Sequence, residues 1–457
     1  MLFLLAGVFL SAENLRADTP ENPSASVVIN AQKTDRRIKP LHGVNSGPKT
    51  YNFMMDTSAY FKEAGFPFAR LHDVEYPLGS GAFVDIHCVF PDFNADPDNP
   101  ASYRFTHTDA YVQAIVDTGC EVFYRLGESI DHGPLKTYVR PPADYEKWAR
   151  ICEGIVRHYN EGWANGFHHR IRYWEIWNEP ENGPMWTGTK EEYFKLYSVA
   201  ANRLKKQFPD IKVGGYAGCG FYAVTRKESD TFHQSLLAYF TQFLDYVSAP
   251  ETKAPLDFFS WHIYNDNPQE VVEHANYVAG VLKQKGFAHA ENILNEWNYG
   301  GHSFDQMRQL GAACYVGGVL CALQHSPVDS AMYYDAQPRQ EYGSLFRQGT
   351  TTPSKVYYAM KAFGALYRLG GEAAASCGDK RVQLCAASNG RDVAALLCNG
   401  AKDDVELSVT VDGLESGKKI ECYLLDDAHD LQKTAEYDVR SCNVCLKGNT
   451  LILLQSK

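Results

Sequence analysis

Eight short apolar segments alternate with helical patterns between residues 41 and 369, and no other feature of the sequence constrains the fold as strongly. The predicted strands cover residues 41–47, 67–72, 120–126, 171–178, 211–217, 257–263, 291–297 and 329–335. Strands that alternate with helices form a parallel sheet, because each helix returns the chain to the same edge. Eight such units in about 330 residues predict an α/β fold, a (β/α)8 TIM barrel with some enlarged loops.

A doubly wound sheet is the alternative fold for such an alternation. It is disfavoured because no glycine-rich phosphate loop follows the first predicted strand. The helical segments carry the expected signals. Trp148, Ile151 and Ile155 recur at helical spacing, and Thr189 with Glu192 forms a capping box ahead of another helix.

The two ends of the chain differ from the barrel segment, which we place at residues 41–369. Residues 1–17 begin with an apolar run that is too short to span a bilayer, which takes about 20 residues. This run fits the hydrophobic part of a signal peptide, so we expect a secreted or periplasmic protein. No later segment of the sequence resembles a transmembrane helix.

Residues 370–457 are expected to form a smaller antiparallel β-domain. Apolar and polar residues alternate from Val405 to Val411, and residues 420–425 and 451–454 are further strand-like segments. The preceding residues 18–40 contain another such segment at 26–29, which we expect to join this β-domain.

Composition removes some classes of function. The net charge is −11 and no Lys/Arg cluster is present, which excludes a nucleic-acid partner. Cys442 and Cys445 form the single Cys-x-x-Cys, and no second pair or His pair lies at zinc spacing. A disulfide is therefore favoured over a metal site there, although the sequence does not pair the sulfurs.

Two predicted strands end in glutamate. Period-two alternation along residues 171–178 puts Glu175, Trp177 and Glu179 on one face, with Glu179 at the end, and the seventh strand ends at Glu296. The active site of a TIM barrel lies at the carboxyl ends of its strands. A carboxylate is costly to bury there without partners or a task. Two of them suit acid/base and nucleophilic catalysis on a glycosidic bond.

The segment 177–180, Trp-Asn-Glu-Pro, resembles the acid/base motif of the retaining (β/α)8 clan of glycoside hydrolases. Segments 141–148, 193–197 and 212–215 are similar to segments of glycoside hydrolase family 39, the β-xylosidase and α-L-iduronidase family. This resemblance covers roughly residues 40 to 370. It implies that Glu179 is the general acid/base and Glu296 the nucleophile, with carboxyl groups about 5–5.5 Å apart. We expect a raised pKa for Glu179 and an ionised Glu296.

The resemblance implies further substrate-binding residues. Asn178 would bind the sugar 2-hydroxyl, its alternative being a turn-former before proline. Arg70 and Tyr264 would hold Glu296 ionised through hydrogen bonds. His72 and His262 would face the sugar, with a purely structural role as the alternative for both.

Three residues depart from a plain β-xylosidase or have open roles. Strand eight often ends in tryptophan in this clan, but here Tyr334 stands near its end. Glu128 adds a third carboxylate after strand three, which could bind a hydroxyl, bind an amino sugar or pair with a loop arginine. Trp186 is expected either to stack on a sugar ring or to pack in the core.

The sequence thus predicts a retaining exo-glycosidase, with β-xylosidase activity as the first substrate hypothesis. The long loop at residues 73–106 favours exo cleavage, because it could close one end of a groove. An endo-glycanase of the same clan is one alternative, and a non-catalytic carbohydrate-binding protein is another. The predicted partner is an oligosaccharide or polysaccharide-derived substrate. No cofactor or metal is implied, since two carboxylates and water suffice.

Overall fold

The computed structural model describes residues 25–457 except 51–53, 75–82, 131–134, 339–341 and 439–440. The predicted leader at residues 1–17 lies outside the described residues. Among those described, no helix is long and apolar enough to cross a membrane.

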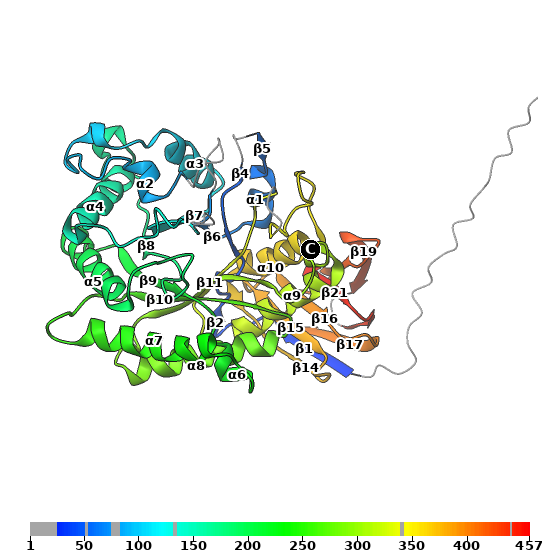
Figure 1. The fold of residues 1–457 in the computed structure, drawn as a ribbon. Coiled ribbons are helices and arrows are strands. Elements are labelled where there is room, and N and C mark those ends of the chain that lie inside the picture. Colours follow the sequence, from blue (N-terminus) through cyan, green and yellow to red (C-terminus); the bar gives the residue numbers. More distant parts are fainter. Residues whose placement is uncertain (1–24, 51–53, 75–82, 131–134, 339–341, 439–440) are drawn as a thin grey trace, which may run out of the picture.

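Eight parallel strands close into a barrel, which confirms the predicted (β/α)8 fold (Figure 1). Each of the eight predicted segments overlaps one barrel strand, and β9, β10 and β11 extend one or two residues beyond the prediction. The strands are β3 (Gly43–Asn45), β6 (Phe68–Leu71), β7 (Glu121–Leu126), β8 (Tyr173–Ile176), β9 (Lys212–Gly218), β10 (Phe258–Asn265), β11 (Glu291–Tyr299) and β12 (Ser330–Tyr333).

Helices cover the outside of the barrel and extend several of its loops (Figure 1). The capping box at Thr189 and Glu192 is present at the start of α5, as predicted. The helices are α1 (Ser58–Ala64), α2 (Ile86–Val89), α3 (Thr106–Val116), α4 (Tyr145–Glu161), α5 (Lys190–Gln207), α6 (Tyr222–Thr225), α7 (Thr231–Ser248), α8 (Pro268–Gln284), α9 (Leu310–Gln324) and α10 (Lys355–Leu369).

Two layers of side chains fill the barrel interior. The lower layer is an apolar cluster of Phe68, Phe123, Tyr173, Phe258, Ile293 and Met332. Side chains alternate along a strand, so the residue two positions further on points to the same interior. Two positions after the apolar residues, the barrel strands carry the buried polar residues Arg70, Arg125, Glu175, Ser260 and Asn295. The polar layer lies towards the carboxyl ends of the strands.

The second unit is built from two sheets. One has the strand order β14 (Ala374–Cys377), β1 (Ala25–Asn30), β17 (Val405–Asp412), β20 (Ser441–Leu446). The other has the order β19 (Asp430–Asp438), β18 (Lys419–Leu425), β21 (Thr450–Ser456), β16 (Val393–Asn399), β15 (Val382–Ser388), β13 (Gly371–Glu372), β2 (Arg36–Arg37). The pairing of β1 with β17 is parallel, so this unit is not purely antiparallel as expected.

The strand β16 joins the β-sheets to the barrel. All seven of its residues are buried. Leu396 and Cys398 belong to the apolar cluster of the barrel, whereas Ala395 and Leu397 belong to the core between the two sheets. The barrel side of this contact includes α9, whose residues are almost all buried.

Cysteines do not cross-link this unit. Cys442 and Cys445 are both free thiols on β20, so the disulfide favoured from the sequence is absent. Two β-strand residues three positions apart point to opposite faces of a sheet, which keeps their sulfurs from meeting. The remaining ten cysteines are free as well.

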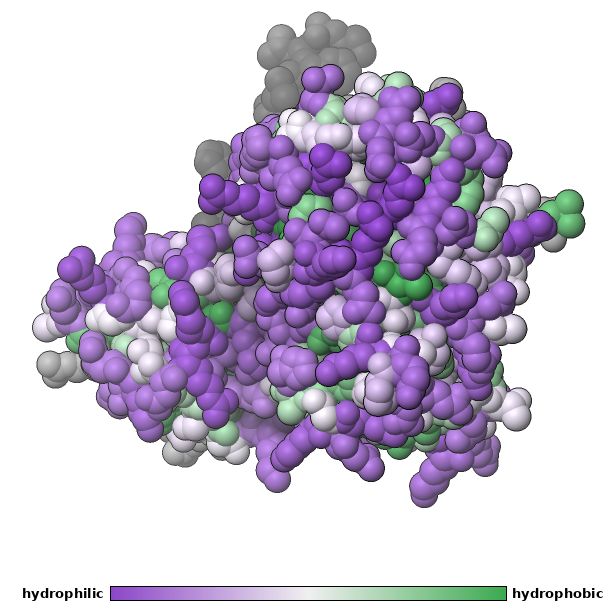
Figure 2. Space-filling view, turned by 90° about the vertical axis from the view of Figure 1, so that its left-hand side faces the viewer, coloured by the Kyte–Doolittle hydropathy of each residue, from purple (hydrophilic) through white to green (hydrophobic). Residues whose placement is uncertain are grey.

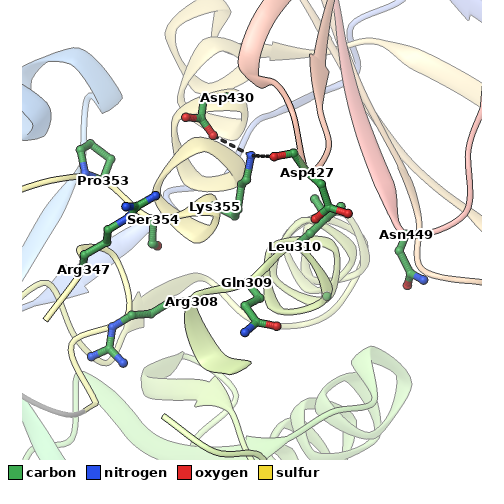
Figure 3. A pocket seen from close by; sticks show the side chains of 11 residues that line it. Arg308, Gln309, Leu310, Arg347, Pro353, Ser354, Lys355, Asp427, Asp430 and Asn449 are labelled. Atoms are coloured by element: carbon green, nitrogen blue, oxygen red, sulfur yellow. Dashed lines mark hydrogen bonds and ion pairs between the residues drawn. The ribbon is translucent and has the colours of Figure 1, made fainter. Parts of the chain in front are cut away.

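A cavity of about 540 Å³ lies at the junction, where the first turns of α9 and α10 meet loops of the β-sheets (Figure 3). Lys355 crosses part of it and donates to Asp430, 2.8 Å away. None of its lining residues belongs to the predicted catalytic site. The outer face of the molecule in Figure 2 is hydrophilic with scattered apolar residues, as expected for a water-exposed surface.

Candidate active site

The candidate site is built at the carboxyl ends of the barrel strands. Arg70 comes from β6, Glu179 follows β8, His262 and Tyr264 lie on β10, and Glu296 lies on β11. The sequence separates them by up to 226 residues, yet direct contacts join them. Six of the ten predicted site residues, these five and Asn178, form one connected group.

An irregularity in β11 brings Glu296 to the mouth. Trp261 pairs with Leu294, but the next residue, His262, pairs with Glu296, so one residue of β11 is extra. If the side chains of β11 alternated strictly between the two faces, only one of Asn295 and Glu296 could point into the barrel. Because of the bulge, Asn295 donates to Glu175 inside the barrel, and Glu296 also contacts Arg70.

The turn after β8 aims Glu179 at the mouth. Trp177 and Glu179 have φ angles of +73° and +43°, which non-glycine residues rarely adopt. Backbone hydrogen bonds hold the turn: Trp177 donates to the Leu126 carbonyl at 2.7 Å, and Glu179 donates to the Ala217 carbonyl at 3.0 Å. A strained backbone conformation of this kind persists only where the surrounding contacts hold it in place.

Arg70 links the interior carboxylates. Its guanidinium is fully buried and donates to Glu175 at 2.8 Å, to Glu296 at 3.1 Å and to Asn178 Oδ1 at 2.6 Å. One cation thus faces two carboxylates. Because the Asn178 carbonyl oxygen accepts from Arg70, its amide N–H groups are left to donate elsewhere, as binding to a sugar hydroxyl requires.

Glu296 is held by groups that favour its charged form. Tyr264 donates to Glu296 Oε1 at 2.6 Å, and Arg70 donates to Oε2. Burial nevertheless raises the pKa of Glu296, and the Arg70 cation and the Tyr264 hydrogen bond act against that rise. The expectation of an ionised nucleophile therefore depends on these partners outweighing desolvation.

Glu179 has partners of another kind. His262 Nδ1 lies 2.7 Å from Glu179 Oε1, and Asn182 donates to Oε2 at 3.2 Å. Burial raises the pKa of Glu179, as predicted for an acid/base, and hydrogen bonds from Asn182 and Cys219 oppose the rise. Burial also lowers the pKa of His262 to about 4, so this imidazole is neutral at neutral pH.

One oxygen of Glu179 and one of Glu296 lie within 4.8 Å of each other, with His262 between them. Retaining glycosidases have carboxyl groups about 5–5.5 Å apart, whereas inverting ones need about 6.5–9.5 Å to admit water. The close approach of the two oxygens fits the shorter of these two spacings.

His72 and Tyr334 lie beside this group. His72 is buried, and its Nε2 lies 3.4 Å from Asp73 Oδ2. Tyr334 donates to the same Asp73 oxygen at 3.0 Å. Both residues thus pair with an aspartate that the sequence had not singled out, because Asp73 follows the predicted strand at the start of a long loop.

Trp186 and Glu128 have local partners. Trp186 is 3% exposed, packs edge-on against Trp177 and donates to the Thr189 carbonyl, so it packs in the core and does not stack on a sugar. Glu128 pairs with His87, not with the loop arginine suggested as one possibility. The loop arrangement that brings His87 there has no signal in the sequence.

Other titratable groups near the mouth were missed by sequence reasoning. Glu181 and Asp335 each have one carboxyl oxygen that is buried and has no hydrogen-bond partner among the described residues. Burial raises the pKa of each to about 8. Their positions, two residues after Glu179 and directly after Tyr334, were the available signal, but closeness in sequence alone does not distinguish a buried carboxyl from an exposed one.

Two trios of side chains have donor atoms close enough to hold a metal ion. One is Glu179, His262 and Glu296, and the other is Asp85, His87 and Glu128. In each trio an arginine already contacts a carboxylate: Arg70 contacts Glu296, and Arg125 contacts Asp85 at 2.6 Å. A guanidinium in that place favours hydrogen-bonded ion pairs over a bound cation, so we assign no metal to either.

The sequence profile of glycosyl hydrolases family 39 matches residues 26–309. A β-xylosidase of Geobacillus stearothermophilus is 27% identical over 252 residues, which are 49% of this chain and 46% of that protein. A β-xylosidase of Caldicellulosiruptor saccharolyticus is 28% identical over 213 residues, covering 44% and 37% respectively. The chain therefore spans less than half the length of these curated relatives.

Solved structures resemble the whole described chain. A glucosidase from Croceicoccus marinus has a TM-score of 0.77 at 21% identity, with 95% of this chain and 98% of that chain covered. A family 39 β-xylosidase from Caulobacter crescentus has a TM-score of 0.71 at 18% identity, with 94% and 99% covered. At these identities the likeness shows that the fold is shared.

Proposed function

The chain belongs to family 39 of the glycosyl hydrolases, and from this premise we propose that it is a retaining, exo-acting glycosidase whose first substrate is a β-xyloside. The observation that carries the proposal is the close approach of the Glu179 and Glu296 carboxyl groups. The names of its curated relatives support the choice of xylose.

The reaction proceeds in two displacements. Protonated Glu179 donates its proton to the leaving oxygen while Glu296 attacks the anomeric carbon, so the glycosidic bond breaks and a glycosyl–enzyme ester forms. Ionised Glu179 then removes a proton from water, which attacks the anomeric carbon and releases Glu296. The raised pKa of Glu179 supports the first role, and the donors Arg70 and Tyr264 support a charged Glu296.

His262 contacts both carboxyl groups, with Nδ1 2.7 Å from Glu179 and Nε2 3.6 Å from Glu296. A neutral imidazole there orients the two groups without supplying a second positive charge. Asn178 is aimed at the 2-hydroxyl by its bond to Arg70, an interaction that strengthens in the transition state.

The nucleophile provides the decisive test. A 2-deoxy-2-fluoro-β-xyloside should trap a covalent adduct, because fluorine destabilises the oxocarbenium-like transition state. Peptide mapping should find the label on Glu296, and Glu296→Gln should lose about 10⁴-fold or more of kcat. NMR of the first product should show the retained anomer. An inverted product, or a label on Glu128 or Asp335, would overturn the assignment.

Two further parts of the proposal are tested separately. A panel of aryl glycosides that includes xylosides and glucosides identifies the sugar, and chain-length analysis separates monomer release from internal cleavage. Export, proposed from the apolar run at residues 1–17, is tested by cell fractionation. Absence of turnover on every glycoside would favour the non-catalytic alternative.

A further inference from the structure

The turn that carries the acid/base is tied to the end of β9 at two points. The Glu179 backbone N–H donates to the Ala217 carbonyl at 3.0 Å. Two residues further along each segment, the Cys219 backbone N–H donates to Glu181 Oε1 at 2.7 Å. The Cys219 thiol lies beside the Glu179 carboxyl and acts to lower the pKa of Glu179. Glu179, Glu181 and Cys219 therefore form a closed ring of contacts.

Among the described residues, no cation forms an ion pair with the Glu181 carboxyl. Its second oxygen is buried and has no hydrogen-bond partner within the described part of the chain. The titratable groups that face it are Glu179 from its own turn, Tyr216 from β9, Cys219 just after β9, Tyr193 from α5 and Tyr239 from α7. Burying a carboxyl oxygen without a partner costs free energy.

We propose that Glu181 is a positioning residue for the acid/base: it clamps the backbone of Cys219, so that the thiol meets the Glu179 carboxyl. This inference rests on the proposed glycosidase function and deepens it. Glu179 must be protonated before the leaving group departs and ionised afterwards. A thiol is a weak donor, so it stabilises the ionised form modestly, whereas a cation in its place would prevent protonation.

The Glu181 carboxyl carries no charge while Glu179 acts as acid and base. Burial raises the pKa of Glu181 to about 8, and the neighbouring charge of Glu179 acts in the same direction. Glu179 therefore ionises first, and Glu181 is a neutral neighbour at neutral pH that gains its charge only in alkali.

Four variants test the clamp on a pair of β-xylosides, one with a poor alkyl leaving group and one with an activated aryl group. Glu181→Leu removes the acceptor and should lower kcat/KM about tenfold or more on the alkyl xyloside but less than about threefold on the aryl xyloside, which needs little protonation. Cys219→Ala should show the same bias more weakly, and Cys219→Ser should restore the wild-type ratio.

Glu181→Gln is the conservative variant that keeps the clamp. Its amide oxygen still accepts from Cys219, so the ratio between the two substrates should stay near wild type. The alkaline limb of kcat/KM should also stay at its wild-type pH, because Glu181 is uncharged while Glu179 titrates. Glu191→Leu, on the exposed face of α5, is the matched control and should match wild type.

The outcomes separate this inference from the proposed function. Inactivity of the wild type on both xylosides and on the glycoside panel would overturn the proposed function. An active wild type with Glu181→Leu equally impaired on both substrates, or with Glu181→Gln as impaired on the alkyl xyloside as Glu181→Leu, would overturn the clamp alone. Thermal unfolding of each variant identifies any loss that comes from misfolding.

Discussion

The two layers inside the barrel use the same strands for opposite purposes. On β10, Phe258 lies in the lower apolar layer, and Ser260, two residues on, lies in the polar layer and donates to Glu175 at 2.6 Å. On β8, Tyr173 and Glu175 show the same change. The step from one layer to the next therefore replaces aromatic packing with buried hydrogen bonds and charges.

The difference between the layers shows where stability and chemistry are located. In the lower layer, Tyr173 stacks on Phe123 and meets Phe68 edge-on, which stabilises the fold by burying apolar surface. In the upper layer, Arg70 must offset the desolvation of two carboxylates, and a buried ion pair adds little net stability. The upper layer is retained for the site it supports.

The largest effect is expected from removing the shared cation. Arg70→Met leaves Glu175 and Glu296 buried without their counter-ion, which should cost about 3–5 kcal/mol of unfolding free energy. It should also lower kcat/KM at least about a hundredfold, because Glu296 becomes protonated. Urea unfolding and aryl glycoside kinetics measure the two losses.

A double variant distinguishes charge balance from catalysis. Arg70→Met with Glu175→Gln removes the pair together, so part of the stability should return while activity stays low. Full activity in Arg70→Met would contradict the role given to Arg70.

The lower layer should respond in the opposite way. Phe258→Ala deletes an aromatic ring from a packed cluster and should cost about 3–5 kcal/mol of stability. Its kcat/KM at a temperature where it stays folded should remain within about threefold of wild type. Ile293→Val, in the same cluster, is a milder version that should cost about 0.5–1.5 kcal/mol. A large loss of kcat/KM in folded Ile293→Val would show that the layers are not separable.

The smallest effect concerns one hydrogen bond in the upper layer. Tyr264→Phe removes a donor to Glu296 and should raise the pKa of that carboxyl further, because the lost bond stabilised its charged form. The acid limb of kcat/KM should then move to higher pH, while the alkaline limb set by Glu179 stays. Tyr277→Phe, on the partly buried face of α8, serves as the control. An unmoved acid limb would show that Tyr264 does not influence Glu296.

Regular patterns in the sequence were enough for the fold and for the two glutamates. The eight strand segments were visible because period-two and helical patterns depend on neighbouring residues alone. Glu179 and Glu296 were singled out because each lies at or near a strand end, and a barrel gathers such ends at one face. Arg70, Asn178, His262 and Tyr264 were added by the resemblance to family 39, and the structure brings all six side chains into one group of contacts.

The sequence by itself determined the barrel, the position of its mouth and the strand ends that carry the two glutamates. Only the tertiary structure decided that Glu296 turns inward through a bulge, that Trp186 is core, and that Glu181 and Cys219 approach Glu179. The physical reason is the difference between interactions of neighbouring residues and interactions of residues far apart in the sequence. Periodicity is a local property, whereas burial and hydrogen bonding depend on which distant segments pack together, and that packing sets the protonation of each carboxyl.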